Sequence, residues 1–158
     1  MSLATAVDNM IRPAIRGLDF LQPLFALFVR LFVANVFWKS GLTKIQSWDT
    51  TVMLFTHEYH VPLLPPAVAA FLGTGVELVF PVLLVLGFGG RMAAAVLFVF
   101  NIIAVISYPD LNEIGVKDHL YWGILLLVPL LYGPGKLSVD CWLRRRYLPN
   151  PWRAHQPK

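Results

Sequence analysis

The sequence predicts an all-α integral membrane protein, a four-helix bundle with both termini in the cytoplasm. Of its 158 residues, 57% are hydrophobic and only 14% are charged, whereas soluble domains carry about a quarter charged residues. A chain of this size cannot hide so much apolar surface in one small core. Four apolar segments also have roughly the length that crosses a bilayer as a helix. We therefore treat residues 1–158 as a single membrane domain.

The predicted spans follow one another with short connections. They cover, approximately, residues 23–44, 66–87, 91–108 and 119–134. The connection between the first two, "IQSWDTTVMLFTHEYHVPLLPP", is too apolar for a solvent loop and too short and polar for a fifth span. It predicts a short interfacial helix, capped by Asp49 or Thr50 and ending at Phe55.

The distribution of basic residues predicts the orientation. Cations gather at the N-terminus, between the second and third spans, and in a basic tail of residues 136–158, namely Arg12, Arg16, Arg91, Lys136, Arg144, Arg145, Arg146 and Arg153. Acidic residues dominate the other two connections. Basic connections stay in the cytoplasm, so we expect a multi-pass protein of the bacterial inner membrane.

Several classes of function are disfavoured. The single cysteine, Cys141, excludes an internal disulfide, a dithiol redox pair and a multi-cysteine metal site. No paired histidines suit a haem, and there is no phosphate-binding loop. Nucleic acid is not an expected partner, because the basic residues are not interleaved with aromatic ones. If the protein takes part in redox chemistry, the electrons reside on a bound molecule or a partner.

One face of the first span is polar. Arg30, Ala34, Phe37, Gly41 and Lys44 follow one another at helical offsets of four, three, four and three residues, which is one stripe. Lipid rejects such a stripe, so we expect it to face the bundle. The alternative for Lys44 is that it snorkels to the outer interface.

Glu77 lies near the middle of the second span, one turn after Gly73. Small residues at this spacing let another helix approach closely. We predict that Glu77 pairs with Arg30, directly or through water or a ligand. The pair either handles a proton and binds a ligand, which makes both residues candidate catalytic groups, or only fixes the helix register.

Further polar and aromatic residues are candidate ligand contacts. Asn101 in the third span suits an interhelical hydrogen bond or a ligand contact. Asp118 is expected to cap the fourth span, which would place His119 in its first turn near the outer mouth of the bundle. Five aromatic residues form a predicted belt that either anchors the protein in the interface or lines a quinone ring, namely Trp38, Trp48, Tyr59, Tyr121 and Trp122.

His57 and His60 are the candidate metal ligands. Their spacing of three residues is compatible with one helix face and a divalent ion. The Val61-Pro62 pair that follows argues that the helix has already ended there. We therefore expect a hydrogen-bonded outer cluster with Lys44 rather than a metal site.

Three stretches resemble the DoxX family of small four-helix membrane proteins. They are "RLFVANVFWKSGLTKI", "GTGVELVFPVLLVLGFGGRMAA" and "GPGKLSVD", in this order and spacing. The resemblance implies a component of a quinone-linked membrane redox system. It carries over to Arg30, Gly41, Lys44, Glu77, Arg91, Gly133, Gly135, Ser138 and Asp140.

A second stretch, "SWDTTVMLFTHEYHVPLLPP", resembles a DoxX subgroup from bacterial clusters that encode copper-binding peptides. Two functions are therefore weighed. The first is a quinone- or small-molecule-binding component with a redox partner protein and no covalent cofactor. The second is a non-enzymatic scaffold or chaperone for a copper-binding peptide or another extracytoplasmic partner. Whether the chain is itself an enzyme, and whether it forms a homo-oligomer, stay open.

Overall fold

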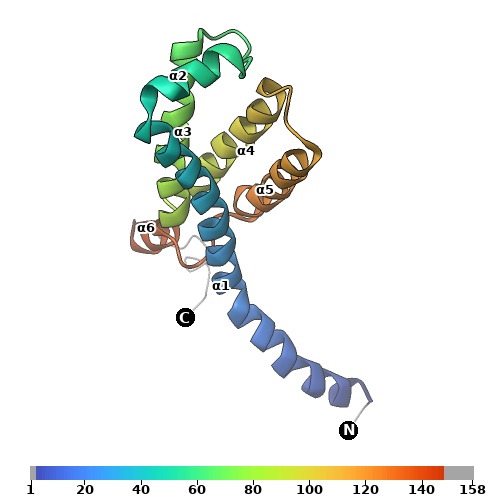
Figure 1. Ribbon diagram of the computed structural model, residues 1–158. Coiled ribbons are helices and arrows are strands. Elements are labelled where there is room, and N and C mark those ends of the chain that lie inside the picture. The colour runs from blue at the N-terminus through green and yellow to red at the C-terminus, as the bar shows by residue number, and fades with distance from the viewer. Residues whose placement is uncertain (1–2, 148–158) are drawn as a thin grey trace.

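The computed structural model describes the backbone of residues 3–147 and the side chains of residues 10–147. This part of the chain is helical with no strand (Figure 1), as predicted. The helices are α1 (Leu3–Gln46), α2 (Trp48–His57), α3 (Pro66–Leu86), α4 (Gly90–Ser107), α5 (Glu113–Tyr132) and α6 (Val139–Tyr147). Four of them, α1, α3, α4 and α5, are long and apolar enough to cross a membrane. The prediction of a four-span bundle is confirmed.

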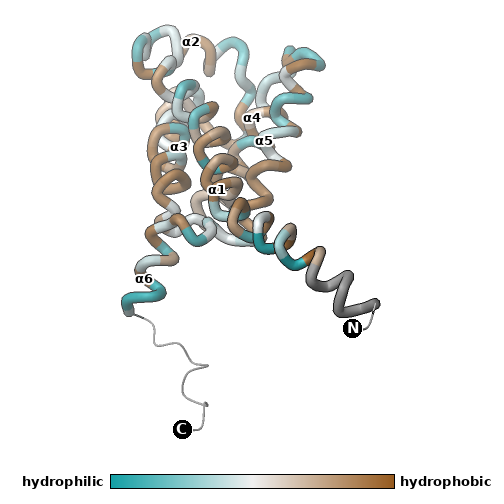
Figure 2. The backbone as a smooth tube through the Cα atoms, turned by 90° about the horizontal axis from the view of Figure 1, so that it is seen from below, coloured by the Kyte–Doolittle hydropathy of each residue, from teal (hydrophilic) through white to brown (hydrophobic). Residues whose placement is uncertain are grey.

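The four long helices pack side by side around one core. Helix α1 packs on α3, α3 on α4, α4 on α5, and α5 returns to α1. The short α2 lies across one end of the bundle against α3 and α1. Figure 2 shows α6 and the start of α1 at the opposite end. We call these the α2 end and the α6 end. The α6 end holds residues 136–147 of the basic tail and is the end predicted to be cytoplasmic.

The polar stripe of the first span faces the interior of the bundle. Arg30, Ala34, Phe37 and Gly41 are all buried, so the stripe faces the bundle as predicted. The core around it is made of apolar side chains from all four spans, namely Val33, Ala34, Phe37, Leu84, Ala93, Ala94, Leu97 and Leu126. Large apolar side chains on the other faces are exposed in the bare chain. Those faces are the surface that the bilayer covers.

Two helix starts differ from the prediction. Helix α1 begins at Leu3 rather than near residue 23, because a helix can continue through Pro13 and Pro23. Helix α5 begins at Glu113, and its cap is Asn112, whose Oδ1 accepts a hydrogen bond from the Gly115 amide at 2.8 Å. The prediction that Asp118 caps this helix was wrong.

The predicted interfacial helix is present as α2. It begins after Ser47, without a side-chain capping bond, and ends at His57, two residues beyond the predicted end. Thr51 and Phe55 are its buried residues, and Phe55 packs on the start of α3. Neither Asp49 nor Thr50 is the cap, so that detail of the prediction was wrong.

At Gly41, α1 approaches α3 closely. A Cβ at this position would lie 2.8 Å from Leu78 Cδ2 and 3.0 Å from Glu77 Cβ. We expect Gly41→Ala to destabilise the protein by about 1–3 kcal/mol, because overpacking forces the helices apart. Unfolding in mixed detergent micelles would measure the loss.

The matched control is Gly75→Ala in α3, where an added Cβ meets nothing within 4 Å. Alanine favours a helix over glycine by up to about 1 kcal/mol, so this variant should keep or raise the stability. Equal losses in the two variants would contradict a close contact at Gly41.

Candidate ligand-binding site

Glu77 lies in a compact polar cluster between α1 and α3. Lys44 Nζ donates hydrogen bonds to both carboxylate oxygens of Glu77 at 2.7 Å and to Ser40 Oγ at 2.9 Å. Ser40 Oγ in turn donates to Glu77 Oε1 at 3.1 Å. The side chains of Glu77 and Lys44 are 6% and 18% exposed. A carboxylate is therefore held within the bundle by a bidentate ion pair.

The predicted pairing of Arg30 with Glu77 was wrong. The Arg30 guanidinium, 1% exposed, donates instead to the carbonyl oxygens of Val85 at 2.8 Å, Leu84 at 3.3 Å and Leu137. Val85 lies eight residues beyond Glu77 on α3, which is about 12 Å along a helix. Because the Arg30 side chain bonds carbonyls near the C-terminal end of α3, it cannot also reach the Glu77 carboxylate.

Arg30 belongs to a second polar assembly at the α6 end. Asp140 accepts hydrogen bonds from the amides of Gly89 and Gly90, both at 2.9 Å, and so caps the start of α4. The Asp140 amide donates to the Gly87 carbonyl at 3.0 Å. Gly87 has a left-handed backbone (φ 64°), and a Cβ there would lie 2.7 Å from the guanidinium. We call Arg30, Gly87 and residues 133–140 the inner latch.

Asn101 forms the predicted interhelical hydrogen bonds. Its Nδ2 donates to the His119 carbonyl at 2.8 Å, and its Oδ1 lies 2.8 Å from His119 Nδ1. The first bond fixes the orientation of the amide, so Nδ1 is the ring nitrogen that carries the proton. Trp122 packs edge-on against the same ring, with 4.7 Å between centroids. His119 is therefore held from two sides.

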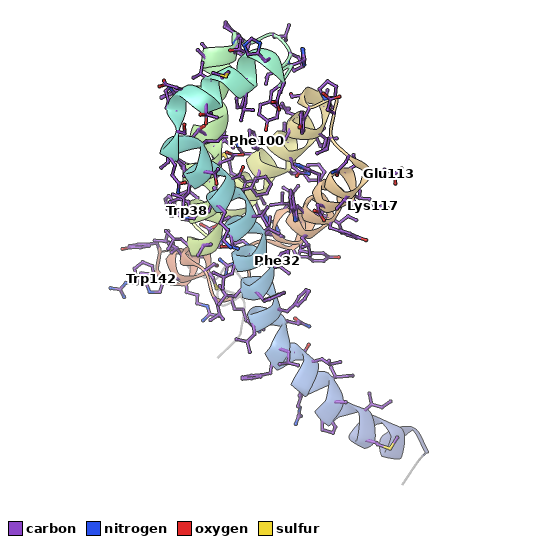
Figure 3. All side chains as sticks on the ribbon, viewed as in Figure 1. Phe32, Trp38, Phe100, Glu113, Lys117 and Trp142 are labelled. Carbon is purple, nitrogen blue, oxygen red and sulfur yellow. The ribbon has the colours of Figure 1, made fainter. Side chains whose placement is uncertain are left out.

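These groups border a cavity of about 630 Å³ at the α2 end. Its polar boundary includes Ser40, Lys44, Glu77 and His119, and its other walls are largely apolar. Figure 3 shows Phe100, one of these wall residues, inside the bundle. The lining residues are Ser40, Lys44, Phe55, Tyr59, Val61, Pro62, Leu63, Leu64, Ala69, Leu72, Gly73, Val76, Glu77, Phe100, Ile103, Ala104, Ser107, Tyr108, Leu111 and His119.

An aromatic cluster closes the α2 end of this cavity. The ring of Tyr59 packs edge-on against Phe55 and Tyr108, with centroids 4.9 and 5.1 Å apart. The His60 amide donates to the Ser107 carbonyl at 2.7 Å, which ties the loop after α2 to the end of α4. Burial raises the pKa of Tyr59, as do the neighbouring Tyr108 and nearby carboxylates. Its hydroxyl therefore keeps its proton at neutral pH.

The other predicted site residues lie elsewhere. Trp38, at the edge of the bundle in Figure 3, lines a separate groove of about 260 Å³ between α1 and α3. His57 and His60 are exposed, and α2 ends before His60. Among the described side chains of residues 10–147, no three histidine, cysteine or acidic groups come together in a way that could hold a metal ion.

The sequence-based prediction missed two polar residues of the site, Ser40 and Ser107. Ser40 lies one turn before Lys44, and this spacing on a buried stripe could have identified it. Ser107 gave no such signal, because it occurs where a helix ends. Tyr59 was expected only as a member of the aromatic belt. Their place in the cavity depends on how the loop folds back over α4.

The fold and the site together define a multi-pass helical membrane protein with a polar cluster bordering an apolar cavity. The DoxX family model matches residues 25–109, and the chain belongs to the DoxX family. A protein of Haemophilus influenzae described as uncharacterized is 30% identical over 134 residues, which is 80% of this chain and 87% of that protein. No solved structure matches the chain at a significant level.

Proposed function

We propose that this protein binds a quinone or a similar small molecule in its cavity, as a component of a redox system of the bacterial inner membrane. The cavity is the observation that supports this. It combines about 630 Å³ of mostly apolar space with the Glu77 carboxylate and the His119 ring. Small-molecule sites commonly have this character, with apolar walls and a few convergent polar groups.

The chemistry of the polar groups suits a ligand that gains or loses protons. A carboxylate and an imidazole are common proton acceptors and donors in proteins. Glu77 and His119 occupy these roles in the proposed site, and Lys44 stabilises the charge of Glu77. Electrons would pass between the bound molecule and a redox partner protein. Arg30, a candidate catalytic residue by sequence, does not line the cavity and has no part in binding under this proposal.

Filling the cavity tests the proposed function. A Cβ at Gly73 would lie 3.6 Å from the rings of Phe55 and Phe100, in ordinary contact, so a larger side chain there must enter the cavity. We expect Gly73→Leu to weaken binding of a short-chain benzoquinone at least about tenfold, measured by titration calorimetry on protein in nanodiscs.

Gly75→Leu is the matched control, since Gly75 lies on the same helix, does not line the cavity and has open space around its Cβ. It should bind the quinone as the unchanged protein does. If the unchanged protein binds neither the quinone nor its hydroquinone, or if Gly73→Leu binds the quinone normally, the proposal is contradicted.

The scaffold for a copper-binding peptide or another extracytoplasmic partner is the second candidate, and the surface of the α2 end favours it. Leu63 is fully exposed, with a strained backbone (φ 66°), and Met53 is 61% exposed. His57 and His60 lie on the same segment. Under this alternative, His57→Ala and His60→Ala should abolish complementation of a deletion strain under copper stress, whereas Gly73→Leu should not.

A further inference from the structure

The hydrogen-bonding groups of the cavity distinguish between the two redox forms of a quinone. We propose that the site binds the dihydroxy aromatic form, the quinol, more tightly than the quinone. This inference rests on the proposed function and goes further, since it names the ligand form that the site selects. It is a statement about binding and includes no electron transfer.

Lys44 has no hydrogen left to offer a ligand. An ammonium group carries three donors, and Lys44 uses three, two on Glu77 and one on Ser40. The Ser40 hydroxyl has a single hydrogen, which it donates to Glu77. A quinone carbonyl, which can only accept hydrogen bonds, therefore finds no free donor at this cluster.

Glu77 does have a free acceptor site. A carboxylate offers about four lone-pair positions, and Lys44 and Ser40 occupy three of them. A quinol hydroxyl can donate to the remaining position, in a charge-assisted hydrogen bond. A quinone oxygen at the same place is also an acceptor, so it could form no hydrogen bond with the carboxylate.

His119, which also borders the cavity, has the same preference for a donor. Because its Nδ1 carries the proton toward Asn101, the neutral ring has its lone pair on Nε2, which is an acceptor. The site therefore presents acceptors from α3 and α5 and donors from neither.

Two hydroxyls of the cavity do not discriminate between the forms. Ser107 Oγ is buried and has no hydrogen-bond partner among residues 10–147, and Tyr59 keeps its proton. Each can donate as well as accept. Ser107 is the last residue of α4, whereas Glu77 lies eleven residues into α3, about 16 Å from its start. The acceptor that distinguishes a quinol from a quinone, Glu77, therefore lies deeper in the bundle than the Ser107 hydroxyl.

Anaerobic titration of three related ligands tests the inference, with the protein in nanodiscs. They are a short-chain hydroquinone, its quinone, and its dimethyl ether, in which both hydroxyl hydrogens are replaced. The hydroquinone should bind at least about tenfold more tightly than the other two, as expected for one hydrogen bond to a charged group.

The Glu77→Gln/Lys44→Gln double variant is the second measurement. It removes both charges together, and its amides bring donors as well as acceptors to the cluster. The preference for the hydroquinone should fall to less than about threefold.

The outcomes separate the two proposals. If quinone or ether binds the unchanged protein as tightly as the hydroquinone, the inference is overturned and the proposed function stands. If the double variant keeps the full preference, the inference is also overturned, because Glu77 then does not cause it. If none of the three ligands binds, both proposals fall.

Discussion

Replacing Arg30 with methionine is expected to destabilise the protein by roughly 3–5 kcal/mol, although methionine fills much of the same volume. The guanidinium is 1% exposed and donates to three backbone carbonyls, from α3 and from the segment before α6. Hydrogen bonds to a charged group contribute about 1.5–3 kcal/mol each, and carbonyls left without donors add a penalty. The inner latch should open, and α6 should separate from the bundle.

Cys141 provides the measurement for this prediction. It is the single cysteine of the chain, it lies in α6, and its amide donates to Ser138 Oγ at 3.2 Å beside the inner latch. Its thiol is half-buried, so the rate of maleimide labelling reports how often α6 leaves the bundle. Arg30→Met should raise this rate by about tenfold or more.

Arg30→Lys is the matched control. An ammonium group can still bond some of these carbonyls, but it lacks the planar, forked donor set of arginine. We expect an intermediate labelling rate and an intermediate stability. Unchanged labelling and stability in Arg30→Met would contradict the role given to the inner latch.

The second large effect concerns the ion pair of Lys44 and Glu77. Either Lys44→Met or Glu77→Leu alone leaves an uncompensated charge inside the bundle, which we expect to cost about 3–5 kcal/mol. The double variant, in which apolar groups replace both charges, should regain most of that loss. A double-mutant cycle on unfolding in mixed micelles measures the coupling between them.

The same cycle separates structure from function. If the ion pair served only to fix the helix register, the folded double variant would still bind the short-chain hydroquinone. Under the proposed function it should fold and bind the hydroquinone at least about tenfold more weakly, because the hydrogen bond to the carboxylate is lost. Additive losses in stability, with no recovery in the double variant, would contradict a direct pair between Lys44 and Glu77.

Much of the fold could be predicted from the sequence, because lipid imposes strict requirements on a membrane-spanning chain. The lengths of the apolar runs predicted all four spans, and the spacing of Arg30, Gly41 and Lys44 predicted which face of α1 is buried. The start of α1 was missed, since a proline inside a helix resembles a helix start in a pattern of residues. The cap of α5 was missed because Asp118 is also a residue type that caps helices, although the true cap, Asn112, lies six residues earlier.

The candidate site was only partly predictable. Three of the predicted residues, Glu77, Lys44 and His119, border one cavity, and Asn101 is hydrogen-bonded to His119 beside it. The partner of Glu77 was wrong, because two cations on one stripe compete for one acid. Their relative depth depends on where each helix starts. Helix ends could be predicted only to within a few residues, and an error of one or two turns is enough to exchange the partners.

Helix α1 also constrains how the molecule sits in a bilayer. Its 44 residues make a rod of about 66 Å, roughly twice the thickness of the hydrocarbon layer. Only its second half packs in the bundle, and Figure 1 shows the first half extending away from it. Pro23 lies where the packing begins and removes one backbone hydrogen bond. The helix can bend at Pro23, so that its first half runs along the membrane surface while the bundle crosses the bilayer.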